Sequence, residues 1–113
     1  MPGKFQIYYD KTGEYRFRLR DDEDHIILVS ESYKQKTSAI KGIESIRSNA
    51  VVDKHYELKT SSNDMFMFNL KAGNGQVIGT SKLYRTEALR EEVIEQVRSL
   101  APVASVDDCA ILS

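Results

Sequence analysis

The chain carries one stretch of sequence twice, and this duplication constrains its fold more than any other feature. Residues 43–50 read IESIRSNA, and residues 94–101 read IEQVRSLA, at an offset of 51 positions. The same offset aligns residues 3–50 with 54–101 without a gap, and many of the matched positions are apolar. Because each unit is too short to bury a large core alone, we expect the two repeats to pack together as one domain spanning residues 1–102.

The composition is that of an ordinary globular protein. Its 113 residues are 41% hydrophobic and 29% charged, which favours a soluble fold over a disordered chain. The formal net charge of −1 argues against a dedicated nucleic-acid binder. The single cysteine, Cys109, excludes an internal disulfide and is compatible with a reducing compartment. No apolar run approaches the roughly 18 residues of a membrane helix, so we expect a cytoplasmic protein with no membrane association.

Within the first unit, the hydrophobic period changes once. Apolar and polar residues alternate over 5–9 and again over 15–19, and 26–29 form a short apolar run, so these segments are predicted to be strands. From about residue 37 the apolar residues follow a helical spacing, namely Ala39, Ile43, Ile46 and Ala50. The unit is therefore predicted to fold as β-β-β-α.

The second unit repeats this order, with Leu89, Val93, Val97 and Leu100 as its expected apolar helix stripe. Thr86 is a suitable cap for the start of that helix. The two helices differ at Gly42, which corresponds to Val93. Gly42 either permits a close backbone approach or is simply exposed, at a cost of about 1 kcal/mol against alanine. Residues 103–113 are expected to form a partly disordered tail, in which Val103 and Val106 could add a short edge pairing.

Several segments carry a resemblance to a known family. Residues 3–5 (GKF), 13–19 (GEYRFRL) and 42–49 (GIESIRSN) resemble the YegP-like family of small bacterial proteins, as do residues 68–72 (FNLKA) and 77–81 (VIGTS) in the second unit. The resemblance implies an α+β fold of two tandem β-β-β-α repeats, with an antiparallel sheet and both helices packed on its apolar side. It implies no activity, because the family is uncharacterised. The segment 21–24 (DDED) departs from the expected Asn-Gly hairpin, and Val93 departs from the usual glycine.

The most prominent candidate binding surface is a row of three arginines on one predicted strand face. Arg16, Arg18 and Arg20 alternate along the strand, about 7 Å apart. They could grip phosphates, with Tyr8 as a stacking platform. The second unit has Met67, Asn69 and Lys71 at these positions, so we favour a solvated face neutralised by carboxylates.

A second candidate surface is the pair Tyr33 and Tyr84, which recur at the strand-to-helix junction of each unit. They could form two equivalent contact sites, but we favour tyrosine rings that close the edge of the core.

No residue set predicts catalysis, a cofactor or a metal. The acidic run 21–24 could hold a hard cation, but it lacks the alternating ligands and glycine of an EF-hand loop. The only histidines, His25 and His55, are not at zinc-ligand spacing. Cys109 lies in the predicted tail, where a nucleophile would lack a rigid setting.

Three hypotheses for function follow. The first, which we favour, is a small non-catalytic interaction module with a protein partner, which could also self-associate through an exposed strand edge. The second is a weak nucleic-acid binder that uses the arginine row. The third is a small enzyme with an unrecognised site. The sequence does not identify the ligand, the partner, the oligomeric state, the biological process or the role of the tail.

Overall fold

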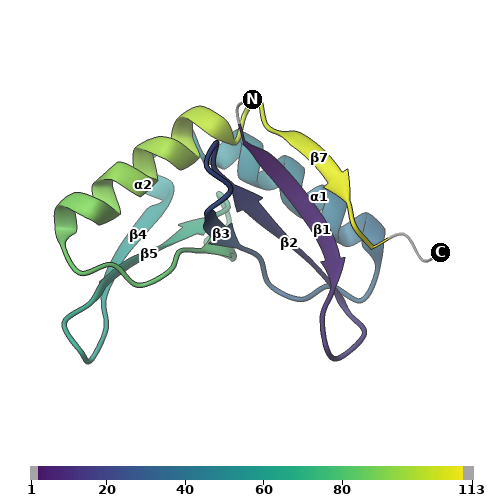
Figure 1. Cartoon of the computed structure of the whole chain (residues 1–113), viewed down its shortest axis with the longest axis horizontal. Helices are drawn as coiled ribbons and strands as arrows, with labels where there is room; N and C mark the ends of the chain where they lie inside the picture. Colours follow the sequence, from purple (N-terminus) through teal and green to yellow (C-terminus); the bar gives the residue numbers. More distant parts are fainter. Residues whose placement is uncertain (1–2, 111–113) are drawn as a thin grey trace.

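The computed structural model describes residues 3–110 and contains two helices and seven strands (Figure 1). In chain order the elements are β1 (Lys4–Tyr9), β2 (Tyr15–Arg20), β3 (Ile26–Val29), α1 (Lys36–Asn49), a 3-10 turn (Asp53–His55), β4 (Tyr56–Thr60), β5 (Phe66–Lys71), β6 (Val77–Thr80), α2 (Glu87–Leu100) and β7 (Ser105–Asp108). The two predicted β-β-β-α units are present, and β7 is added after the second. No helix in this described part of the chain is long and apolar enough to cross a membrane.

All seven strands form one sheet, in the order β4-β5-β6-β3-β2-β1-β7. The two units meet where β3 pairs with β6, so the order of the second unit reverses that of the first. Every pairing within and between the units is antiparallel, as predicted. The exception is β7, which pairs with β1 in parallel. The α+β class is confirmed, and the sheet is mixed because of this one strand.

The hairpin turns explain how the acidic run replaces a glycine hairpin. Asp24 has a φ of 70° and stands where the second unit has Gly75, with a φ of 88°. The reverse exchange occurs in the other hairpin, where Gly13 has a φ of 82° and Asp64 has a φ of 60°. Aspartate tolerates the left-handed region better than most residues. The two units therefore keep the same backbone with different turn residues.

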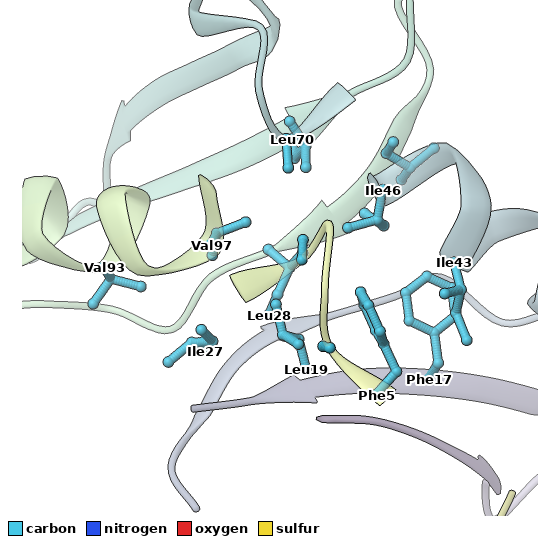
Figure 2. Packing of buried hydrophobic residues seen from close by; sticks show 14 of the residues in the cluster. Phe5, Phe17, Leu19, Ile27, Leu28, Ile43, Ile46, Leu70, Val93 and Val97 are labelled. Carbon is cyan, nitrogen blue, oxygen red and sulfur yellow. The ribbon is translucent and has the colours of Figure 1, made fainter. Parts of the chain in front are cut away.

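One hydrophobic core joins both units and both helices on one side of the sheet. Figure 2 shows Ile27 beside α2, and it shows Phe5 and Phe17 beside Ile43 of α1. Each helix also reaches strands of the other unit, since α1 contacts β5 and β6 while α2 contacts β3. Gly79 in β6 leaves room for this packing, because a Cβ there would lie 2.8 Å from the Leu28 side chain of β3 and 3.1 Å from the Cδ1 atom of Ile46. The units are thus interlocked, as their small size requires.

The apolar stripe predicted for α1 is confirmed, and the stripe predicted for α2 needs correction. Val93 and Val97 are buried, but Leu89 is 44% exposed and Arg90 is buried in its place. The guanidinium of Arg90 lies over the Phe66 ring, 5.3 Å from its centroid, and its Nη1 donates to the Lys59 carbonyl at 3.3 Å. These contacts, together with the carboxylates of Glu87 and Glu91 at 3.7 and 3.5 Å, offset part of the cost of burying a charged group, although the Arg90 Nε has no hydrogen-bond partner among the described residues. Thr86 caps the helix as predicted, accepting a hydrogen bond from the Leu89 amide.

Gly42 is a site of close approach. It is buried, and a Cβ on it would lie 2.7 Å from the Tyr33 hydroxyl oxygen and 2.8 Å from a Phe17 ring carbon. Tyr33 and Phe17 stack, with ring centroids 6.3 Å apart. The glycine therefore makes room for an aromatic pair against α1.

The prediction of a partly disordered tail at 103–113 is wrong for residues 105–108. They form β7, in which Val106 lies opposite Phe5, and the Cys109 amide donates to the Ile7 carbonyl at 2.8 Å. Lys36 forms an ion pair with Asp108 and fastens the strand to the start of α1. The short edge pairing suggested by Val106 is thus present. Residues 111–113 lie outside the described part of the chain.

Candidate functional site

The arginine row lies on the helix-free face of the sheet, and several of its donors are engaged by neighbouring groups. Arg16 donates from Nε and Nη2 to the Ser30 carbonyl, at 3.2 and 2.7 Å. Arg18 and Arg20 both donate from Nε to the side-chain oxygen of Gln6, at 3.0 and 2.6 Å. The Arg18 guanidinium also covers the Tyr8 ring, 4.3 Å from its centroid. The ring face predicted to stack on a base is therefore already occupied.

The recurring tyrosines have a structural role in each unit. Each pairs its backbone with the start of a strand, since Tyr33 bridges Tyr15 and Tyr84 bridges Phe66, with hydrogen bonds of 2.7 Å. Partial burial raises the pKa of both phenols above the ordinary value of 10.0. The structure does not bring the two tyrosines together into one site, because they line separate clefts.

The acidic loop gathers three groups of the kind that hold metal ions. One ligand atom from each of Asp21, Glu23 and His25 lies within 4.8 Å of the others. The Asp21 carboxylate, however, accepts hydrogen bonds from the Glu23 and His25 amides, at 2.9 and 2.8 Å. Burial alone would raise the pKa of Asp21, but these hydrogen bonds hold it below its ordinary value of 3.8. The carboxylate closes its own loop, which accounts for its position without a ligand.

The two edges of the sheet differ, and this difference defines the strongest candidate site. In Figure 1, β7 lies at one edge and β4 at the other. β4 is the counterpart of β1 in the second unit, but among residues 3–110 no strand pairs with its outer side. Ile7 of β1 is 1% exposed, while its counterpart Leu58 in β4 is 51% exposed. β7 lies beside Ile7, whereas no strand among residues 3–110 lies on the outer side of Leu58.

The hydrogen-bonding alternation shows which backbone groups of β4 face outward. The Ser61 amide donates to the Met65 carbonyl, so residues an odd number of steps from Ser61 turn their amides and carbonyls away from β5. Leu58 and Thr60 are therefore turned outward. The first unit supports this assignment, because the carbonyl of Ile7, the counterpart of Leu58, does accept a hydrogen bond from Cys109 in β7.

A shallow cleft lies beside this edge, between β4 and α2. It has a volume of about 290 Å³, and it is lined by Asp53, Tyr56, Leu58, Glu91, Ile94, Glu95 and Arg98. Its three carboxylates outnumber its one guanidinium, and Arg98 already pairs with Asp53 and Glu95. Burial raises the pKa of the Tyr56 phenol, whose hydroxyl donates to the Ala50 carbonyl at 2.7 Å. The edge thus offers an apolar leucine, outward backbone groups and an acidic border.

The sequence pattern did not indicate this edge, because Leu58 looked like any other strand residue. The alignment of Ile7 with Leu58 was visible, but it gave no sign that a tail strand would cover only one of them.

The fold and this edge define a class: a single α+β domain of two tandem repeats, in which β1 is covered by an added strand and β4, among residues 3–110, is not. The family described as "Domain of unknown function (DUF1508)" matches residues 10–57 and again 61–108. These two matches have the same offset of 51 as the sequence repeat. They begin later in each unit than predicted, so that each match ends on the strand that follows a helix.

The sequence similarity to known proteins extends along nearly the whole chain. The chain is 53% identical over 94% of its length, and 96% of the other's, to "UPF0339 protein in ptx operon 5'region" of Stutzerimonas stutzeri. It is 44% identical to the UPF0339 protein YegP of Escherichia coli, with 96% and 98% covered. The chain belongs to the UPF0339 family, which includes YegP.

Solved structures support the same fold. The solution structure of YegP from E. coli, described as a protein of unknown function, matches with a TM-score of 0.94 at 42% identity, covering 100% of this chain and 97% of that one. A UPF0339 protein from Shewanella oneidensis matches with a TM-score of 0.92 at 33% identity, covering 97% and 93%. No function is assigned in these comparisons, as the resemblance implied.

Proposed function

We propose that this protein is a small non-catalytic interaction module that binds an extended polypeptide strand along the outer edge of β4. The observation that carries the proposal is the contrast between Leu58, which is 51% exposed, and Ile7, which is 1% exposed at the matching position. The fold covers β1 with its own strand β7, and among residues 3–110 no strand covers the equivalent side of β4.

Strand addition fits the chemistry of this edge. The outward amides and carbonyls of Leu58 and Thr60 are the groups to which a further strand would bond. In the first unit, β7 makes such a bond through the Cys109 amide to Ile7. Side chains of a bound strand point to alternate faces of the sheet, and the cleft beside α2 would receive those on the helix-covered face. An exposed edge strand of this kind favours pairing with another chain.

Three carboxylates of the chain are held ionised by hydrogen bonds, which fits a structural role for these three groups. A general base works best when its pKa lies near the working pH. Here hydrogen bonds lower the pKa of Asp10 to about 2, and they also lower the pKa values of Glu57 and Asp108. These groups are tuned to stay ionised as structural acceptors. We also propose a cytoplasmic location, on the ground that the single Cys109 is unpaired.

We propose no nucleic-acid function for the arginine row, because Ser30 and Gln6 occupy several of its donors. An alanine variant at Arg16, Arg18 and Arg20 tests this directly. RNA binding that falls with salt and disappears in that variant would replace the present proposal with the nucleic-acid one.

Site-specific photocrosslinking tests strand binding at β4. A photoreactive amino acid would replace Leu58 in the native host, with a matched variant at Ile40, which is 44% exposed on α1. We expect discrete crosslinked products from position 58 and none of the same size from position 40. The products from position 58 should disappear when Thr60→Pro removes an outward amide. Identical product patterns from the two positions, or none from position 58, would refute the proposal.

A further inference from the structure

We propose that the strand that pairs with β4 is β4 of a second copy of this chain, antiparallel to the first, with the twofold axis passing through Leu58. This inference rests on the proposed function, because it names the partner of the same edge. The result would be one sheet that continues across two molecules, through an interface built from the same residues of each copy.

Hydrogen bonding restricts the pairing to a few registers. Every second residue of β4 turns its amide and carbonyl away from β5, namely Tyr56, Leu58 and Thr60. Only these residues can exchange hydrogen bonds with a second copy. An antiparallel pair of identical strands is therefore centred on residue 57, 58 or 59 when it keeps most of β4 paired. A pair centred between two residues would instead place the outward backbone groups of one strand opposite residues of the other strand whose backbone groups point towards β5.

Charge selects one of these three registers. Centring on Glu57 would place two glutamates directly opposite each other, and centring on Lys59 would do the same with two lysines. Centring on Leu58 instead places Glu57 of each copy opposite Lys59 of the other. These would be non-hydrogen-bonded pairs, in which opposing side chains come closest. Opposite charges at such positions stabilise a sheet, and like charges destabilise it. The sequence of β4 is thus complementary to itself in one register only.

The helix-facing side of this register covers the exposed apolar residue. Leu58 lies opposite Leu58 of the second copy as a hydrogen-bonded pair, in which the two Cα atoms are about 5.5 Å apart. The two side chains point to the same face, where each is 51% exposed in the single chain. Tyr56 and Thr60 would flank them across the axis. Pairing therefore gives Leu58 the cover that β7 gives Ile7.

The charges also argue against β7 of a second copy as the occupant. In the first unit, β7 is held by the ion pair between Lys36 and Asp108. The counterpart of Lys36 in the second unit, at the offset of 51, is Glu87. An acidic strand that docked on β4 as β7 docks on β1 would meet a carboxylate in place of an ammonium group. The outer side of β4 is thus unsuited to a strand like β7, which covers β1 in the first unit.

Five paired residues form a small contact, below the roughly 1,200 Å² typical of stable complexes. The dimer is therefore expected to be weak and reversible, and its population should depend on protein concentration.

Charge-exchange variants of the purified full-length chain test the register. Sedimentation equilibrium would follow the mass of wild type, E57K, K59E and an equal mixture of the two variants. We expect wild type to rise with concentration from 12.9 kDa towards twice that mass. Each single variant places like charges opposite each other, so its association constant should fall at least about tenfold. The mixture restores both opposite-charge pairs and should recover the wild-type association.

A control variant and a folding check make the result specific. K11E makes the same charge change as K59E at an exposed turn residue of the other unit and should associate like wild type. Thermal melting would confirm that E57K stays folded after losing the Glu57–Lys71 ion pair.

A wild-type chain that stays monomeric at all concentrations would overturn the inference, as would a dimer that ignores the charge exchange. In either case, crosslinks from position 58 to another protein would leave the strand-binding function standing. Absence of both association and crosslinks would remove the two together.

Discussion

Truncating Ile7 and Leu58 in parallel would measure what β7 contributes to the fold. The two residues hold the same register position in the two units, opposite Phe17 and Phe68. Ile7 is 1% exposed and Leu58 is 51% exposed. Ile7→Ala removes three buried carbons, worth about 0.8 kcal/mol each, and leaves a cavity, so we expect a loss of about 3–4 kcal/mol. Leu58→Ala removes a half-exposed group without a closed cavity and should cost about 1 kcal/mol or less.

Urea unfolding followed by circular dichroism would measure this difference. A gap of about 2 kcal/mol corresponds to about 1 M in the midpoint for a slope of 1–3 kcal/mol/M. Low protein concentration keeps any dimer from adding to the cost at Leu58. Equal midpoints for the two variants would refute the reasoning, since they would mean that β7 does not seal Ile7.

A chain that ends at Pro102 provides the second arm of the experiment. Without β7, Ile7 should become partly exposed like Leu58, and the cost of Ile7→Ala should fall by about 1–2 kcal/mol. An unchanged destabilisation by Ile7→Ala in the shortened chain would show that α1 alone, and not β7, shields Ile7 from solvent.

Two further predictions concern close packing and pH. Gly42→Ala should lower the free energy of unfolding by about 1–3 kcal/mol, because the added carbon would overlap an aromatic pair, whereas Gly73→Ala, which meets nothing within 4 Å, should be neutral or slightly stabilising in the same urea assay. The hydrogen bond from Lys36 holds the pKa of Asp108 below its ordinary value of 3.8, so its contribution is present above that pH and is lost as the pH falls through the folded-state pKa. The amide of Cys109 should then exchange hydrogen faster relative to amides of β5, and Asp108→Asn should abolish this pH dependence.

The strands, helices and tandem organisation could be predicted because their signals are local. The alternation over 15–19 and the helical spacing of Ala39, Ile43 and Ile46 depend only on residues close in sequence, and the repeat supplied each signal twice. The same reasoning missed the burial of Arg90. Its position is apolar in the first unit, but hydropathy assigns arginine to the surface, and the compensating contact with Lys59 comes from another strand.

The candidate site could not be predicted for a related reason. Among the described residues β4 has no partner on its outer side, and β1 has one only because β7, about a hundred positions later in the chain, pairs with it. A short polar segment such as 105–108 carries little periodicity of its own. The arginine row, in contrast, is a clear pattern, but its hydrogen-bond acceptors are mainly the uncharged oxygens of Gln6 and Ser30, whereas carboxylates were expected.

The pairing of β1 with β7 also bears on how the chain folds as it is synthesised. Lys4 pairs with Ser105, so β1 receives its outer neighbour from a segment that is made only after both repeats. Until then, Ile7 lies at an open edge, and its neighbours are exposed to other nascent chains. Contacts of such long sequence separation also slow folding. Synthesis therefore passes through a stage at which β1 and β4 are both edge strands, and β7 covers β1 only after both repeats have been made.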